Sequence, residues 1–299
     1  MEKELNGIII INKPEGFTSF DVIAKLRGML HMKRLGHAGT LDPMATGVLP
    51  VFVGKATKAC DILPNDEKSY EAGFKLGIKT DTQDITGRIV FEEKSNAKPD
   101  DIYEKVKLFL GETEQIPPMY SAVSIGGKRL YELAREGKEI ERRPRKIRVD
   151  KIEVLNFDEN SQTGSLKIYC SKGTYIRTII HDLGEALGAG GVLTSLERTS
   201  SSGYDISQSH TLDEIQTLVD SGKSVEDIML SIDSAFEEYE KIVLNQKHTR
   251  LYKNGVRLRD EQVGVSPDKS LYRVYGFDNE FLGLGCFKNG EFCSRKNFY

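Results

Sequence analysis

A mixed α+β fold is predicted, with a small β-rich module at its C-terminal end. Three observations favour this class. The apolar runs are short and of strand length, several segments have the spacing of amphipathic helices, and after residue 240 the pattern changes to short strands between turn residues. At 299 residues the chain is long enough for about two domains, which we expect at 1–239 and 240–299.

The expected elements of the first domain alternate between strands and helices. Gly7–Asn12 has four isoleucines between turn residues, the pattern of a buried strand. Thr18 or Ser19 can cap a helix that runs to Leu30. The later elements, in chain order, are a glycine-rich loop at 36–47, a strand at 48–53, a helix at 55–63, paired strands at 70–76 and 87–91, a helix at 99–110, a protruding insertion at 117–150 with a short helix at 130–135, a hairpin of 146–157 with 165–170, a helix at 178–187, a strand at 192–198, and two acidic helices at 211–221 and 224–237.

The composition excludes several classes of protein. At 38% hydrophobic and 29% charged residues the chain can bury a core, which excludes global disorder. Its four cysteines form no CxxC pair, which argues against a disulfide scaffold or a zinc ribbon and fits a reducing cytoplasm. No apolar run is long enough for a signal-peptide core or a membrane span.

The net charge of −3 hides two basic regions. Residues 128–151 carry a net charge of +5 and residues 240–299 a net charge of +4, while residues 205–239 carry −8. Because electrostatic steering depends on local patches, the chain total does not exclude a nucleic-acid partner. For a nucleic-acid partner, both basic regions would be expected to flank the binding cleft and the acidic helices to face away from it.

Motifs for bound cofactors are not matched. Six residues separate Gly47 from Gly54-Lys55, whereas a P-loop has four and continues with Ser or Thr. The five histidines show no metal-ligand spacing. Neither a metal nor a nucleotide cofactor is therefore expected.

One constellation points to chemistry. The segment LGHAGTLDPMATG, residues 35–47, places His37 and Asp42 in an irregular, glycine-rich loop. Glycines allow the backbone to approach a ligand closely, and an aspartate in such a loop can serve as nucleophile or general base. From the spacing alone, Asp42 can equally be a turn residue and His37 an exposed loop residue.

The string GHAGTLDPMATGVLPVFVGKATK resembles the first signature of the TruB family of tRNA pseudouridine-55 synthases. Five further blocks resemble the family in its order along the chain: GIIIINKPEGFTSFDVI, KSYEAGFKLGIKTDTQDITG, IPPMYSAVSIGGKRLYELAREG, SKGTYIRTIIHDLGEALG and GGVLTSLERTSSG. Together they span about residues 7–203. The tail from Lys241 resembles a small PUA-like RNA-binding domain, with less distinctive residues.

The resemblance implies a pseudouridine synthase fold with a thumb insertion at 117–150, and a specific reaction. One uridine in the T-arm loop of tRNA is isomerised to pseudouridine: the glycosidic C–N bond breaks and a C–C bond forms at C5. No cofactor is needed. The implied partner is the tRNA T-arm stem-loop, without a membrane, and we expect a monomer.

The resemblance also implies roles for single residues. Asp42 matches the catalytic aspartate, which acts at the sugar C1′, at the base C6, or by removing a sugar proton. Arg177 matches its arginine partner, and a guanidinium beside a carboxylate lowers the pKa of that carboxylate. Tyr70 matches the tyrosine that stacks on the target base, where stacking is worth about 1–3 kcal/mol. Its hydroxyl is also a candidate for removing the C5 proton, although an ordinary tyrosine pKa near 10 makes it a poor base.

Further residues are assigned to substrate contacts. Tyr175 and Leu196 match residues that line the uridine pocket, and His37 matches the histidine that fills the space of the everted nucleotides. One departure concerns Glu197, which stands where the family has an arginine. The residues expected on the RNA backbone are Lys13, Lys68, Arg142, Arg143 and Arg145.

Two other functions are consistent with these residues. The first is a tRNA-binding, folding chaperone in which catalysis is secondary; the Asp42–Arg177 pair argues against lost catalysis. The second is a hydrolase that uses Asp42 with Asp84 or Asp182 as paired carboxylates, although nothing in the sequence places either of them beside Asp42.

Overall fold

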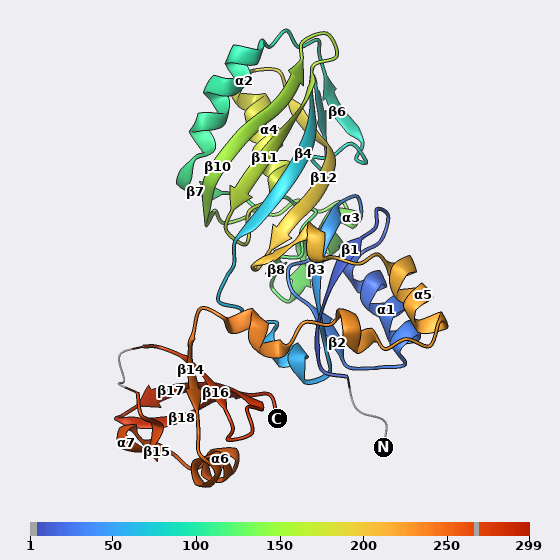
Figure 1. Cartoon of the computed structure of the whole chain (residues 1–299). Helices are drawn as coiled ribbons and strands as arrows, with labels where there is room; N and C mark the ends of the chain where they lie inside the picture. The colour runs from blue at the N-terminus through green and yellow to red at the C-terminus, as the bar shows by residue number, and fades with distance from the viewer. Residues whose placement is uncertain (1–4, 266–268) are drawn as a thin grey trace.

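A nine-stranded, mainly antiparallel sheet forms the centre of the N-terminal domain (Figure 1). The computed structural model describes residues 5–265 and 269–299. The strands run in the order β1-β3-β12-β4-β11-β10-β7, with β2 beside β3 and β13 beside β12. Their bounds are β1 (Gly7–Lys13), β2 (Leu35–His37), β3 (Thr46–Val53), β4 (Lys68–Leu76), β7 (Gly111–Gln115), β10 (Arg145–Asp158), β11 (Thr163–Cys170), β12 (Gly191–Ser201) and β13 (Tyr204–Asp205). The predicted α+β class is confirmed.

Helices cover the sheet at both of its ends. The helices α2 (Pro99–Lys105) and α4 (Ile176–Ala186) pack on the half formed by β4, β10, β11 and β12. The helices α1 (Ser19–Leu30) and α5 (Leu212–Asp220) pack on β1 and β3 (Figure 1). In the described residues, no helix has both the length and the apolar character needed to cross a membrane.

Strand β1 is buried on both faces, which explains its run of isoleucines. Ile9 and Ile11 face the core beneath α1 and α5, whereas Ile8 and Ile10 face a second core that reaches the C-terminal domain. All four side chains are at most 2% exposed. The sequence prediction of a buried strand and of the following Thr18-capped helix is therefore confirmed.

The predicted pairing of residues 70–76 with 87–91 is wrong. Strand β4 pairs with β11 and β12, while β6 (Ile89–Glu92) pairs with the separate short strand β5 (Ile78–Thr80). Gly77, at φ +89°, turns the chain out of the central sheet between β4 and β5. Glycine adopts such a backbone without strain. The chain can therefore leave the central sheet at Gly77, and the hairpin forms between β5 and β6 instead of between β4 and β6.

Three other boundaries differ from the prediction. The helix expected at 55–63 is a shorter 3₁₀ segment, η1 (Gly54–Ala59), and the second acidic helix consists of two 3₁₀ turns, η4 (Val225–Ile228) and η5 (Ile232–Phe236). The thumb insertion ends before Arg145, because β10 pairs with β7 from that residue onward. The 3₁₀ turn η2 (Val106–Phe109) follows α2 and precedes the thumb insertion, which itself contains β8 (Ser124–Ile125), β9 (Lys128–Arg129) and α3 (Leu130–Arg135).

A five-stranded sheet forms the C-terminal domain from Glu240 onward, in the order β14-β16-β17-β18-β15. Its elements are β14 (Glu240–Val243), α6 (Gln246–Lys253), β15 (Leu258–Arg259), α7 (Asp260–Val263), β16 (Tyr272–Tyr275), β17 (Phe281–Lys288) and β18 (Glu291–Asn297). The prediction of a β-rich module holds, but the helix α6 was not predicted. Asn254-Gly255, a turn signal in the sequence, lies at the end of this helix and not between two strands. Asn289, at φ 55°, does form the predicted hairpin turn.

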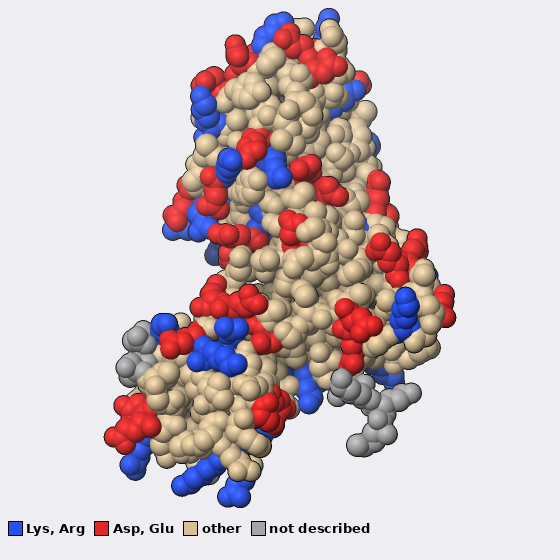
Figure 2. All heavy atoms as spheres, in the orientation of Figure 1, with Lys and Arg blue, Asp and Glu red and all other residues tan. Residues whose placement is uncertain are grey.

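The two domains share a core. Phe52, Ala56 and Ala59 of the first domain pack in one cluster with Leu284 and Phe298 of the second. Figure 2 shows acidic side chains over the corner formed by α5, away from the C-terminal domain. The acidic side chains of α5 thus lie apart from the C-terminal domain, whereas Asp233 of η5 accepts a hydrogen bond from the hydroxyl of Tyr275 in that domain.

Gly47 is required where β3 meets β12. These strands pair in parallel, with Gly47 opposite Arg198. Gly47 has φ +97°, and a Cβ at this position would lie 2.3 Å from the carbonyl oxygen of Arg198. A side chain here would push apart the two strands that flank the Asp42 loop, defined as residues 38–45.

We predict that Gly47→Ala lowers the free energy of unfolding by about 3 kcal/mol or more, because it adds a backbone clash to a strained φ. Gly188→Ala is the matched control: Gly188 has φ +66° with open space around it. That control should cost only about 1–2 kcal/mol. Denaturant unfolding of both variants measures the difference, and equal losses would contradict the clash.

Candidate active site

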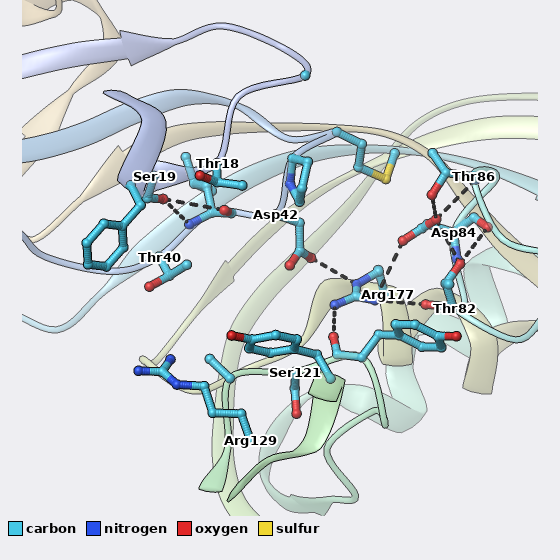
Figure 3. A pocket seen from close by; sticks show the side chains of 18 of the residues that line it. Thr18, Ser19, Thr40, Asp42, Thr82, Asp84, Thr86, Ser121, Arg129 and Arg177 are labelled. Atoms are coloured by element: carbon cyan, nitrogen blue, oxygen red, sulfur yellow. Dashed lines mark hydrogen bonds and ion pairs between the residues drawn. The ribbon is translucent and has the colours of Figure 1, made fainter. Parts of the chain in front are cut away.

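A cavity of about 1020 Å³ lies between the Asp42 loop and the thumb insertion. The start of α1, the loop between β5 and β6, and Arg177 of α4 complete its walls. Figure 3 shows Arg129 and Ser121 of the thumb insertion across the cavity from Thr18, Ser19 and Thr40. Five segments of the chain thus surround one space.

Asp42 and Arg177 form an ion pair in this cavity. The carboxylate Oδ2 of Asp42 lies 2.9 Å from Nε of Arg177. The Arg177 side chain is only 4% exposed, whereas that of Asp42 is 39% exposed. Asp42 therefore presents its carboxylate to the cavity while the arginine holds it from within the protein. The predicted pair is confirmed as a geometric unit.

Arg177 also connects three other groups. Its Nη1 donates to the carbonyl oxygen of Thr82 at 2.8 Å, and its Nη2 donates to that of Tyr120 at 2.7 Å. The carboxylate of Asp84 approaches Nη1 at 3.6 Å, on the side away from Asp42 (Figure 3). One buried guanidinium therefore joins the Asp42 loop, the β5–β6 loop and the thumb insertion to α4.

The surroundings of Asp42 act on its pKa in opposite directions. Desolvation by the cavity walls raises the pKa of Asp42, and the nearby Asp84 carboxylate adds to the increase. Arg177 and, more weakly, Lys13 lower it. The net direction is upward, which corrects the expectation from the ion pair alone: burial outweighs the guanidinium.

Three buried polar side chains fasten the Asp42 loop. Ser19 Oγ accepts a hydrogen bond from the backbone N–H of Leu41 at 2.9 Å. Arg198 donates to the carbonyl oxygens of Gly39 at 2.8 Å and Val48 at 2.7 Å. Lys13 donates to the carbonyl oxygen of Pro43 at 3.2 Å. These bonds hold Asp42 in position from both sides of the loop.

Lys13 is not available to RNA, contrary to the prediction. Its side chain is 0% exposed, and Nζ also donates to the carbonyl oxygens of Pro14 and Phe17. Burial lowers the pKa of Lys13 to about 8. Lys68 is half-buried and does not line the cavity; burial and then Arg198 lower its pKa to about 8.

Tyr70 and Leu196 lie beneath the cavity rather than in its wall, and the half-buried Tyr175 does not line the cavity either. Tyr70 and Leu196 are each 7% exposed and pack in the same core cluster as Leu41. The backbone of Tyr175 is held by the side chain of Gln115 through two hydrogen bonds. Burial raises the pKa of Tyr70, with Arg198 acting in the opposite direction, so its hydroxyl is a still poorer base than expected.

The thumb insertion contributes other residues than those predicted. Arg129, Tyr131 and Arg135 line the cavity, and the guanidinium of Arg135 lies 5.5 Å from the centre of the Tyr131 ring. Arg142 instead donates to the carbonyl oxygen of Pro117 and pairs with Glu139. The other two predicted arginines, Arg143 and Arg145, are exposed outside the cavity wall, Arg145 as the first residue of β10.

His37 does line the cavity, as expected. Its ring meets that of Phe20 edge-on, with 6.1 Å between the centroids. Burial and then Arg198 lower the pKa of His37, which favours the neutral imidazole. Glu197, half-buried on β12 opposite Glu71, is not part of the cavity wall.

Sequence reasoning did not assign the supporting roles of Asp84, Ser19 and Arg198. Asp84 accepts from the hydroxyl of Thr82 at 2.9 Å and from the backbone N–H of Thr86 at 3.0 Å, and it is 5% exposed. The alternation of Asp and Thr in DTQDITG is a signal for such a self-bonded loop. No local signal marked Ser19 or Arg198, because their partners lie far away in the chain.

Comparisons with known proteins agree with this geometry. The family described as TruB family pseudouridylate synthase, N-terminal domain, matches residues 27–176, and the tRNA pseudouridylate synthase B C-terminal domain matches residues 177–237. The tRNA pseudouridine synthase B of Clostridium novyi is 43% identical over 94% of this chain and 95% of its own. That of Clostridium kluyveri is 41% identical over 98% of this chain and 100% of its own.

The fold is similar to that of a chain in the crystal structure of a Cbf5-Nop10-Gar1 complex. The TM-score is 0.74 at 26% identity, over 98% of this chain and 85% of the other. A chain in an H/ACA RNP bound to a substrate RNA containing 2′-deoxyuridine shares the fold, with a TM-score of 0.73 and 24% identity. This similarity covers 98% of this chain and 85% of the other. This chain therefore belongs to the TruB family of pseudouridylate synthases and is an isomerase.

Proposed function

We propose that this enzyme isomerises uridine 55 in the T-arm loop of tRNA to pseudouridine, and that Asp42 is its catalytic group. The observation that carries the proposal is the Asp42–Arg177 ion pair, which presents a carboxylate to a cavity walled on one side by a basic insertion. The tRNA substrate follows from the names of the relatives in the two Clostridium species. We place the reaction in the cytoplasm.

The chemistry needs an ionised carboxylate at the sugar–base bond. The N1–C1′ bond breaks, the base turns within the cavity, and C5 bonds to C1′. C5 then loses its proton and N1 takes up a proton from solvent, so that the product is an isomer of the substrate. Asp42 Oδ2 is occupied by Arg177, and the exposed part of the side chain faces the cavity. Asp42 can then attack C1′ or C6, or remove a sugar proton. Arg177 supplies a positive charge that favours the ionised carboxylate and so opposes the effect of burial.

The target uridine must leave the stack of the RNA loop before it can enter the cavity. Base flipping costs a few kcal/mol, and contacts to the loop offset this cost. We assign this role to Arg129, Tyr131 and Arg135, since cations bind phosphates and aromatic rings receive unstacked bases. Tyr70 and Leu196 lie just below the cavity. We propose that these two residues and Tyr175 contact the uridine after substrate binding opens the cavity floor.

The C-terminal domain, residues 240–299, is proposed to be a PUA-like RNA-binding domain. Its net charge of +4 is the supporting observation. None of its described residues lines the Asp42 cavity, so its contacts with RNA must lie elsewhere on the tRNA. A monomer is sufficient for both contacts.

The two other functions receive less support. A hydrolase would need a second carboxylate that is free to act, but Asp84 is already bonded to Thr82, Thr86 and Arg177, and Asp182 does not line the cavity. A pure tRNA chaperone does not need the Asp42–Arg177 pair. A chaperone activity alongside catalysis is compatible with the same surface.

Asp42→Asn is expected to abolish the reaction while RNA binding survives, because the amide cannot act as nucleophile or base. Release of tritium from C5-labelled uridine in unmodified tRNA should fall by at least about 1000-fold. Asp61→Asn, at an exposed position outside the cavity, is the control and should retain the wild-type rate. Release by Asp42→Asn at the wild-type rate would refute the assignment.

The pH dependence reports the environment of Asp42. Because burial raises the pKa of Asp42, the acid limb of the pH profile of kcat/KM should have its midpoint above the ordinary aspartate pKa of 3.8. Arg177→Gln removes a positive charge that lowers this pKa, so the limb should move to higher pH, whereas Arg177→Lys should move it less. A limb that moves to lower pH in Arg177→Gln would contradict the ion pair. Circular dichroism at each pH controls for unfolding.

The thumb insertion can be tested with two sets of arginines. Arg129→Gln/Arg135→Gln should weaken tRNA binding and reduce the slope of log K against log salt by about 1 for each lost phosphate contact. Arg143→Gln/Arg145→Gln removes the same charge outside the cavity and should have the smaller effect. An equal effect of both pairs would show that position in the cavity is irrelevant.

A further inference from the structure

Four basic side chains gather where the two domains meet. Arg34 precedes β2, Lys55 and Lys58 belong to η1, and Lys296 belongs to β18. We call these four residues the junction cluster. Arg34 is exposed and the three lysines are half-buried. They come from both domains, so only the folded chain places them together.

Hydrogen bonds show that these residues are neighbours. Arg34 Nε donates to the hydroxyl of Thr57, which lies between the two lysines of η1, at 3.0 Å. Lys58 Nζ donates to the carbonyl oxygen of Asn297, the residue after Lys296, at 2.8 Å. The first contact fixes Arg34 against η1, and the second fixes η1 against the last strand of the C-terminal domain.

No acidic partner compensates the junction cluster. Within residues 5–265 and 269–299, none of its four side chains forms an ion pair, whereas Lys253 and Lys269 of the same C-terminal domain pair with glutamates. Burial, followed by the charges of Arg34, Lys55 and Lys296, lowers the pKa of Lys58. Mutual repulsion of this kind is relieved when an anion binds.

The cluster is held on a rigid base. Ala56 and Ala59 of η1 are fully buried in the core that also contains Leu284 and Phe298 of the C-terminal domain. The positions of the cations are therefore set by packing between the domains. A preorganised set of cations binds a polyanion without the cost of assembling them.

The position of the cluster suits an RNA that occupies the Asp42 cavity. Strand β2 runs from Leu35, next to Arg34, to His37 in the cavity wall. Three residues of strand span about 10 Å. An RNA loop in the cavity thus has its flanking backbone within reach of Arg34 and its neighbours.

We propose that the junction cluster is a phosphate-binding site for the backbone of the bound tRNA, outside the loop that enters the Asp42 cavity. This inference rests on the proposed function, since it takes tRNA as the substrate. The site reads no sequence: the cations contact phosphates and set the orientation of the RNA across the two domains.

The test uses Lys55→Gln/Lys296→Gln, because neither side chain makes a hydrogen bond or an ion pair in the described part of the chain, and the fold should persist. Binding of unmodified tRNA is measured by fluorescence anisotropy over a range of KCl concentrations. The slope of log K against log salt should fall by about 2, and binding at 0.1 M salt should weaken by about tenfold or more. Tritium release in single turnover at saturating enzyme should stay unchanged.

The matched control is Lys98→Gln/Lys107→Gln, which removes the same charge from two lysines that are paired with Glu159 and Glu104. It should leave the slope unchanged. A wild-type slope in the junction variant, or an equal decrease in the control, would overturn the phosphate site. If instead the wild-type enzyme releases no tritium from tRNA, the proposed function fails, while the binding slopes still report on the cluster.

Discussion

The active site depends on one buried arginine. Arg177 is 3% exposed, and burying a guanidinium is unfavourable unless its charge and its N–H groups find partners. Its partners come from three segments: Asp42, the Thr82–Asp84 turn, and the carbonyl oxygen of Tyr120. The requirement to satisfy this one side chain therefore brings the Asp42 carboxylate, the β5–β6 loop and the thumb insertion to the same point.

A second buried arginine shapes the loop that carries Asp42. Arg198 is fully buried and has no carboxylate partner in the described residues; it donates to two carbonyl oxygens that flank the loop, at Gly39 and Val48. Gly47 lets β3 approach the backbone of the same residue. The basic residues of this chain thus differ in what surrounds them. Lys13, Arg177 and Arg198 are buried and hold the fold, and surface lysines such as Lys98 and Lys107 pair with glutamates. Arg129 and Arg135 of the cavity wall and the four residues of the junction cluster form no ion pair in the described residues.

The difference between buried and accessible basic side chains explains which site residues could be predicted from the sequence. Asp42, His37 and Arg177 stand in distinctive motifs, and the structure brings all three to the cavity. Lys13 also stands in such a motif, but a lysine that touches phosphate and a lysine that donates to buried carbonyls have the same sequence context. Arg142 was expected on RNA and is engaged with Pro117 and Glu139 instead, whereas Arg129 and Arg135 reach the cavity.

Local sequence by itself determined the family, the α+β class, the isoleucine strand, the Thr18-capped helix and the position of Asp42, because periodicity, caps and motifs act over a few residues. Only the tertiary structure decided that β4 pairs with β11 and β12 rather than with β6, that Asp84 stands behind Arg177, and that Lys58 and Lys296 are neighbours. Each of these depends on contacts between distant segments, and the energy of such contacts is set by burial and charge in the folded chain.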